Sequence, residues 1–97
     1  MKDLVIVGTG GVGRETAQIV EEINKVKKEW NILGFIDDNK DLIGKLINGY
    51  EVIGNRIYLN NLDREVYVII AIANYSVKKE LVEFLTNKNI KYATIIH

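Results

Sequence analysis

The 97-residue sequence has no cysteine and no proline, and its single histidine is the last residue, His97. Without cysteine the chain can form no disulfide, no thiolate metal site and no cysteine nucleophile. Ser76 is its sole serine, about twenty positions before His97, so a Ser–His–Asp triad would depend on a chain terminus that nothing fixes in place. We therefore expect this chain to carry no catalytic residue and no metal site.

The sequence also lacks net charge and long apolar runs. Thirteen Lys and Arg balance thirteen Asp and Glu, which leaves no positive field to hold a nucleic-acid backbone or an anionic membrane surface. No apolar run approaches the roughly 18 residues of a membrane span. The Leu4–Val7 run is shorter than the core of a signal peptide and stops at Gly8. We expect a cytoplasmic protein that binds neither nucleic acid nor membrane.

The composition indicates one folded domain over residues 1–97, because 47% hydrophobic and 27% charged residues are typical of a globular chain of this length. Short apolar runs alternate with amphipathic stretches. The runs predicted to be strands are Leu4–Val7, Ile32–Ile36, Tyr50–Ile53 within a long glycine-rich loop, Val66–Ala73 and Tyr92–Ile96.

Two amphipathic stretches predict helices. One starts near Gly13 and continues for about four turns, with apolar residues at three- and four-residue spacing. The other is expected to be capped by Ser76 and to stop at Asn87. The alternation of strand and helix predicts an α/β fold with an open, mainly parallel sheet of four to five strands and flanking helices.

A glycine motif joins the first predicted strand to the first predicted helix. Residues 8–13, Gly-Thr-Gly-Gly-Val-Gly, match G-x-G-x-x-G in the strand-to-helix context that the motif requires. In this motif Gly8 permits the tight turn, Gly10 lets a ligand approach the backbone, and Gly13 allows close packing of helix on strand. The free N–H groups of a helix start suit a phosphate. The motif favours a phosphate-bearing ligand, and the alternative is that the glycines serve only the sharp turn.

Polar residues at the predicted strand ends add candidate contacts. Asp37 and Asp38 lie 24 and 25 positions after Gly13, where a carboxylate can accept hydrogen bonds from a ribose diol or sugar hydroxyls, or simply form a polar turn. Asn74 follows the strand Val66–Ala73 and either faces the same crevice or begins the next helix. Arg14 either binds the phosphate or pairs locally with Glu15. About 97 residues hold one nucleotide-binding half, so a nucleotide or nucleotide-sugar fits better than a dinucleotide.

Five segments in this order resemble one family across essentially the whole chain. They are residues 10–15 (Gly-Gly-Val-Gly-Arg-Glu), 34–39 (Gly-Phe-Ile-Asp-Asp-Asn), 48–54 (Asn-Gly-Tyr-Glu-Val-Ile-Gly), 70–74 (Ile-Ala-Ile-Ala-Asn) and 95–97 (Ile-Ile-His). They are similar to the amino-terminal domain of bacterial sugar acyltransferases of the sialic-acid O-acetyltransferase and pilin-glycosylation (bacillosamine) N-acetyltransferase type. The family implies a Rossmann-like domain that binds the nucleotide-sugar acceptor. A following left-handed β-helix of hexapeptide repeats, expected to be absent from this chain, forms trimers, binds acyl-CoA and carries the catalytic histidine.

The resemblance implies a UDP-sugar bound by the glycine loop, with Asp37 and Asp38 contacting its nucleoside or sugar hydroxyls. The candidate site residues are Gly8, Gly10, Gly11, Val12, Gly13, Arg14, Asp37, Asp38 and Asn74. The full-length protein is then expected to be a homotrimeric sugar O- or N-acetyltransferase with acetyl-CoA as co-substrate, while this chain binds no cofactor. His97 matches the histidine that ends the family's domain and is not assigned catalysis. The chain departs from the family at Val12, where some members have histidine, and at Ala73, where many have glycine.

Two other functions are compatible with the same loop. One is an NAD(P)-binding module of a reductase or a redox-sensing protein, for which Asp37 favours NAD over NADP. The other is a domain that has lost its ligand and serves as a structural cap for the rest of the protein.

Overall fold

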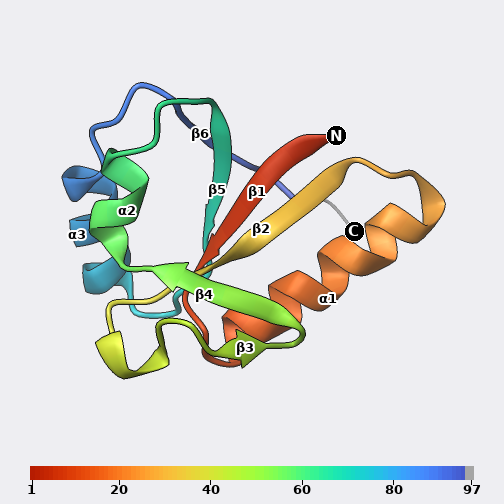
Figure 1. Cartoon of the computed structure of the whole chain (residues 1–97), viewed down its shortest axis with the longest axis horizontal. Coiled ribbons are helices and arrows are strands. Elements are labelled where there is room, and N and C mark those ends of the chain that lie inside the picture. The colour runs from red at the N-terminus through yellow and green to blue at the C-terminus, as the bar shows by residue number, and fades with distance from the viewer. Residues whose placement is uncertain (96–97) are drawn as a thin grey trace.

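The computed structural model describes residues 1–95 and contains one six-stranded sheet in the order β3-β4-β2-β1-β5-β6 (Figure 1). In chain order the elements are β1 (Lys2–Val7), α1 (Gly11–Val26), β2 (Trp30–Ile36), the 3-10 helix η1 (Lys40–Leu42), β3 (Leu46–Ile47), β4 (Tyr50–Gly54), α2 (Arg56–Asn60), β5 (Val66–Ile70), α3 (Tyr75–Phe84) and β6 (Ile90–Tyr92). Neighbouring strands are parallel except β3 and β4, which are antiparallel. The predicted α/β class and mainly parallel sheet are confirmed.

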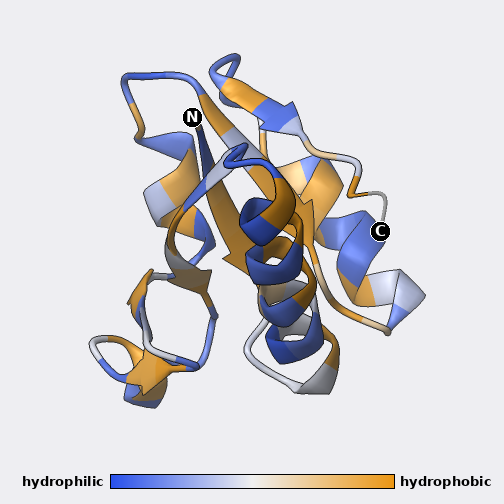
Figure 2. Ribbon diagram, turned by 90° about the vertical axis from the view of Figure 1, so that its right-hand side faces the viewer, coloured by the Kyte–Doolittle hydropathy of each residue, from blue (hydrophilic) through white to orange (hydrophobic). Residues whose placement is uncertain are grey.

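Helices cover both faces of the sheet. Helix α1 packs on one face, and α2 and α3 pack on the other (Figure 1). Strand β1 supplies both cores, since Leu4 and Ile6 face α1 while Val5 and Val7 face α2 and α3, all nearly inaccessible to solvent. The middle strands are the most hydrophobic part of the ribbon (Figure 2). This arrangement explains why the first run is apolar without alternation.

The sheet has six strands where four to five were predicted, because the glycine-rich segment after β2 forms a hairpin. Strands β3 and β4 pair through Ile47 and Tyr50, and the two residues between them, Asn48 and Gly49, have φ of 51° and 84°. Two positive φ angles in a two-residue loop are the geometry of a type I′ turn, which Asn-Gly favours. The predicted short strand Tyr50–Ile53 is therefore confirmed as β4, whereas the expectation that the rest of this segment is loop was wrong, and the short helix α2 was not predicted.

The last strand and the cap of α3 also differ from the prediction. The predicted last strand is present as β6, but it spans Ile90–Tyr92 and ends where its pairing with Val68 ends, so the predicted bounds Tyr92–Ile96 were wrong as far as residue 95; residues 96–97 lie outside the described part. Asn74 rather than Ser76 caps α3, since its side chain accepts a 3.1 Å hydrogen bond from the N–H of Val77. Asparagine is as good a cap as serine and occurs first along the chain.

No helix within residues 1–95 has the length and apolar character needed to cross a membrane.

Candidate functional site

The glycine motif forms the connection between β1 and α1. At Gly8 φ is 108°, and a Cβ there would lie 2.7 Å from the carbonyl oxygen of Ala71. At Gly13 a Cβ would lie 1.9 Å from the carbonyl oxygen of Gly8. A side chain at either position would collide with backbone that cannot move away cheaply. The roles predicted for Gly8 in the turn and for Gly13 in close packing are confirmed.

Gly10 and Gly11 occupy the same loop but have no such constraint. A Cβ at either position would meet no atom within 4 Å. Gly10 has φ of −73°, a conformation that any residue adopts, and it caps α1 without a side-chain hydrogen bond. The N–H groups of Gly11 and Val12 find no acceptor among residues 1–95. The start of α1 therefore presents uncrowded, unpaired amides to the space beside it.

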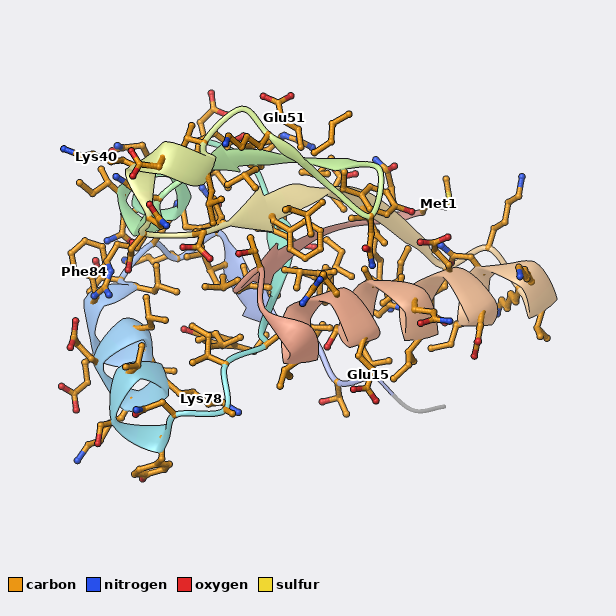
Figure 3. The ribbon with its side chains drawn as sticks, turned by 90° about the horizontal axis from the view of Figure 1, so that it is seen from below. Met1, Glu15, Lys40, Glu51, Lys78 and Phe84 are labelled. Carbon is orange, nitrogen blue, oxygen red and sulfur yellow. The ribbon has the colours of Figure 1, made fainter. Side chains whose placement is uncertain are left out.

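Two adjoining clefts lie at the carboxyl edge of the sheet. The larger, of about 300 Å³, is lined by Gly8, Thr9, Gly10, Gly11, Val12, Asp37, Ala71, Ile72 and Ala73. The smaller, of about 180 Å³, is lined by Val7, Gly8, Ile36, Asp37, Asp38, Ile72, Val77 and Leu81. Figure 3 shows the molecule from the side of this edge, with α1 and Glu15 on one side and α3 with Lys78 on the other. Gly8, Asp37 and Ile72 line both clefts, so the glycine loop and the acidic turn form one continuous site.

Asp37 is anchored to the glycine loop. Its Oδ2 accepts hydrogen bonds from the hydroxyl of Thr9 at 2.8 Å and from the N–H of Thr9 at 3.2 Å, and its Oδ1 accepts from the N–H of Asn39 at 2.9 Å. Parallel pairing of β1 with β2 brings these strand ends together. The carboxylate is thus held at the boundary of both clefts, with one further acceptor position of its roughly four still open.

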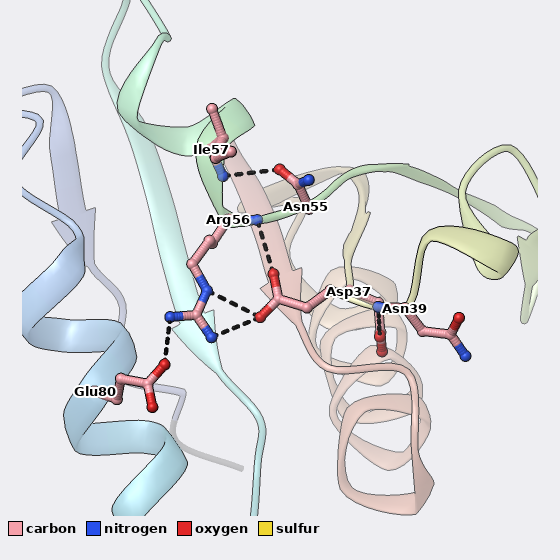
Figure 4. Close-up of polar contacts among 7 residues, drawn as sticks. Asp37, Asn39, Asn55, Arg56, Ile57 and Glu80 are labelled. Carbon is pink, nitrogen blue, oxygen red and sulfur yellow. Dashed lines mark hydrogen bonds and ion pairs between the residues drawn. The ribbon is translucent and has the colours of Figure 1, made fainter.

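Asp38 lines the smaller cleft and is held by Arg56, whose contacts are drawn as dashed lines in Figure 4. Its Oδ2 accepts from Nε of Arg56 at 2.9 Å and from Nη2 at 2.6 Å, and its Oδ1 accepts from the backbone N–H of Arg56 at 3.2 Å. These hydrogen bonds from Arg56 hold the pKa of the Asp38 carboxyl below its usual value. The same contact with Asp38, followed by one with Glu80, raises the pKa of Arg56. Asp38 is therefore an ionised partner of Arg56.

Three predicted site residues line neither cleft. Gly13 is buried under the loop. Arg14 is exposed in the first turn of α1, and its side chain makes no ion pair within residues 1–95, so the predicted alternative of local pairing with Glu15 is not seen there. Asn74 uses its side-chain oxygen to cap α3. Of its two predicted roles, helix entry is the one for which the structure gives a contact.

Other residues of the site were not predicted. Thr9 occupies a position of the G-x-G-x-x-G motif at which any residue is allowed, so the motif does not predict its hydrogen bond to Asp37. Val77 and Leu81 are four residues apart, which predicted only the apolar face of a helix, yet both line the smaller cleft. Arg56 is 18 residues from Asp38 and 24 from Glu80, and no local pattern indicates such pairs. Within residues 1–95 no three His, Asp or Glu side chains are grouped so that they could hold a metal ion.

Comparison with known proteins places this chain in a family. The family described as "PglD N-terminal domain" matches residues 3–85. The chain is 33% identical over 95 residues to GDP-perosamine N-acetyltransferase of Escherichia coli O157:H7, in an alignment that covers 95% of this chain and 41% of that protein. The chain thus spans about two fifths of the length of this relative, 41%.

Solved structures with the same fold belong to proteins of different kinds. UDP-D-quinovosamine 4-dehydrogenase from Vibrio fischeri superposes with a TM-score of 0.69 at 24% identity, over 99% of this chain and 79% of that one. RSP, a Rex-family repressor, in complex with β-NAD+ and operator DNA superposes with a TM-score of 0.54 at 20% identity, over 100% of this chain and 45% of that one. At these identities the likeness shows the Rossmann-like fold alone. The match over residues 3–85 shows that the chain belongs to the PglD N-terminal domain family, which confirms the resemblance found in its sequence.

Proposed function

We propose that this chain binds the nucleotide-sugar acceptor of a sugar acetyltransferase. The observation that carries the proposal is the uncrowded pair Gly10 and Gly11 at the start of α1, beside the anchored carboxylate of Asp37. The fold requires glycine at Gly8 and Gly13, but neither backbone conformation nor packing requires it at Gly10, and packing does not require it at Gly11. A ligand that approaches the backbone supplies a reason for glycine at both positions.

In this proposal the diphosphate lies in the larger cleft. The N–H groups of Gly11 and Val12 donate to its oxygens, and the positive end of the dipole of α1 favours its charge. Arg14, exposed in the same helical turn and without an ion pair within residues 1–95, supplies a positive side chain for a phosphate. Asn74 retains its side-chain NH₂ group as a donor, because its oxygen is the atom that caps α3.

The nucleoside lies toward the smaller cleft. Asp37 accepts a hydrogen bond from a ribose or sugar hydroxyl through its open acceptor position. Ile36, Ile72, Val77 and Leu81 give this cleft apolar walls that suit the face of a nucleobase. The pyrophosphate and the nucleoside thus contact different parts of one continuous site.

The full-length protein is proposed to transfer an acetyl group from acetyl-CoA to the sugar. Its relative in Escherichia coli O157:H7 carries the name of an N-acetyltransferase, and the chain spans 41% of that protein. Catalysis, acetyl-CoA binding and trimerisation are assigned to a hexapeptide-repeat β-helix that follows this domain, and the protein is proposed to act in the cytoplasm. The present residues then bind and present the acceptor without transferring the group.

Calorimetric titration tests the binding proposal. We expect saturable binding of a UDP-sugar or a GDP-sugar, and loss of that binding in Gly10→Val, whose side chain fills the approach to the loop. Asp37→Ala should weaken binding, whereas the matched control Asp41→Ala, in η1 away from both clefts, should not. Saturable NAD+ binding without nucleotide-sugar binding would replace the proposal with a dinucleotide module. Binding of neither class, with an unaltered melting temperature, would indicate a structural cap.

A further inference from the structure

Arg56 links three elements around the smaller cleft. It is the first residue of α2, and its guanidinium donates both to Asp38 at the end of β2 and to Glu80 on α3, the latter from Nη1 at 2.8 Å (Figure 4). Its Cζ also lies 5.4 Å from the ring centre of Phe84 on α3. Asp38 and Glu80 are 18 and 24 residues from Arg56 along the chain, so Arg56 joins segments that are distant in sequence.

The burial of Arg56 separates it from an ordinary surface ion pair. Its side chain is 19% exposed, whereas that of Arg64, paired with Asp3 at the opposite edge of the sheet, is 53% exposed. A guanidinium that is fixed by two carboxylates and an aromatic ring loses little further freedom when a ligand binds next to it.

The smaller cleft lies between the groups that Arg56 holds. Asp38 lines one side of it, and Val77 and Leu81 of α3 line the other. Glu80 is in the same helical turn as Leu81, so the Arg56–Glu80 contact ties the α3 wall of the cleft to Arg56 and through it to Asp38. The charge of the Asp38 carboxylate is paired with the Arg56 guanidinium, whereas Asp37 makes no ion pair within residues 1–95.

We infer that Arg56 is a positioning residue for the nucleoside end of the ligand: by holding Asp38 and Glu80 together it sets the width of the smaller cleft, and it leaves Asp37 as the carboxylate that meets a ligand hydroxyl. This inference rests on the proposed function. The planar guanidinium is required because it reaches two carboxylates through separate nitrogens, which the single ammonium of lysine does not reproduce.

Calorimetry on the 97-residue chain, with UDP, GDP and inorganic pyrophosphate as probes, tests the inference. In the proposed binding mode pyrophosphate occupies the larger cleft alone, so its affinity reports on the site without the smaller cleft. We expect Arg56→Gln to weaken the better-bound nucleoside diphosphate about tenfold and to leave pyrophosphate affinity within about twofold. Arg56→Lys should remain about tenfold weaker as well, because charge alone does not restore the linked geometry.

Two further variants keep the test decisive. Glu80→Gln weakens one arm of the link by removing its charge, at a side chain that is 66% exposed, so it should fold and should weaken nucleoside diphosphate binding about threefold. Arg64→Gln, the matched control, should change neither affinity. Wild-type affinity for the nucleoside diphosphate in Arg56→Gln, Glu80→Gln or Arg56→Lys, or an equal loss of pyrophosphate binding, would overturn the inference while the proposed function stands. A wild-type chain that binds none of the probes would instead remove the proposed function and the inference with it.

Discussion

The hydroxyl of Thr9 donates a 2.8 Å hydrogen bond to Oδ2 of Asp37, 28 residues further along the chain, and the N–H of Thr9 donates to the same oxygen at 3.2 Å. These bonds join the glycine loop to the end of β2. The backbone supports the same contact, since the N–H of Gly8 donates to the carbonyl of Ile36 at 2.8 Å. The acidic side chain is therefore fixed against the loop by the protein itself, before any ligand is present.

Thr9→Val should lower the free energy of unfolding by about 1 kcal/mol, because it removes one hydrogen bond to a part-buried carboxylate at nearly constant volume. Urea unfolding at neutral pH measures this difference. Thr16→Val is the matched control: within residues 1–95 the Thr16 hydroxyl donates only to the carbonyl of Val12 in α1, so its loss should change the free energy by less than about 0.5 kcal/mol. Equal values for the two variants would show that the link between loop and strand contributes nothing specific.

Gly13→Ala should destabilise the fold by more than about 3 kcal/mol. Its Cβ would lie 1.9 Å from the carbonyl oxygen of Gly8 and 2.8 Å from the carbonyl carbon, so α1 would have to move away from β1. Thermal unfolding followed by circular dichroism measures the loss. A variant that melts at the wild-type temperature would contradict the close helix–strand packing described above.

Gly11→Ala should separate stability from binding. The added methyl meets no atom within 4 Å, and alanine is a better helix former than glycine, so the free energy of unfolding should stay level or rise by up to about 1 kcal/mol. The same methyl stands in the path of a ligand that approaches the amides, so nucleotide-sugar affinity should fall. Urea denaturation measures the free energy of unfolding of the variant, and calorimetry measures its affinity for the nucleotide-sugar. Unchanged affinity would mean that the ligand does not approach the backbone at Gly11.

The sequence predicted those features of the fold and site that depend on neighbouring residues, and it missed those that depend on contacts between distant segments. The strand of Leu4–Val7, helix α1 and the meeting of the glycine loop with Asp37 follow from short patterns and from the order of elements, and the structure has all of them. The β3–β4 hairpin was also signalled locally, by Asn48-Gly49 between apolar residues, but the many glycines around it favoured a loop. The cap of α3 was misplaced because Asn74 and Ser76 are both good caps two positions apart.

The pairing of Asp38 with Arg56 is a non-local feature, which the sequence did not predict. Sequence alone treated Asp37 and Asp38 as equivalent, since both follow β2 directly. Their difference arises because α2 begins beside Asp38 and directs Arg56 toward it, whereas Asp37 faces Thr9. Such contacts are set by how elements pack, and charges 18 residues apart leave no periodic signal in a chain.

Asp38→Asn should have a pH-dependent effect on stability. Because the contacts with Arg56 lower the pKa of Asp38 in the folded state, this ion pair stabilises the fold above the ordinary carboxyl pKa, and the stabilisation is lost as the pH falls through the folded pKa. The melting temperature of the wild type should exceed that of the variant at pH 7, and the gap should close as the pH falls through the ordinary carboxyl pKa, about 4, toward the lower pKa of the folded state. Arg56→Gln should give the same profile; a gap that is constant with pH would contradict the assignment.

Amide NMR spectra of the 97-residue chain during titration with a UDP-sugar and a GDP-sugar test the central claim most directly. If the amides at the start of α1 hold the diphosphate, the signals of Gly10, Gly11 and Val12 should shift saturably with one of these ligands, while that of Gly49 in the β3–β4 turn should stay in place. Saturable binding with the loop signals unmoved, or no binding of either ligand, would contradict the account.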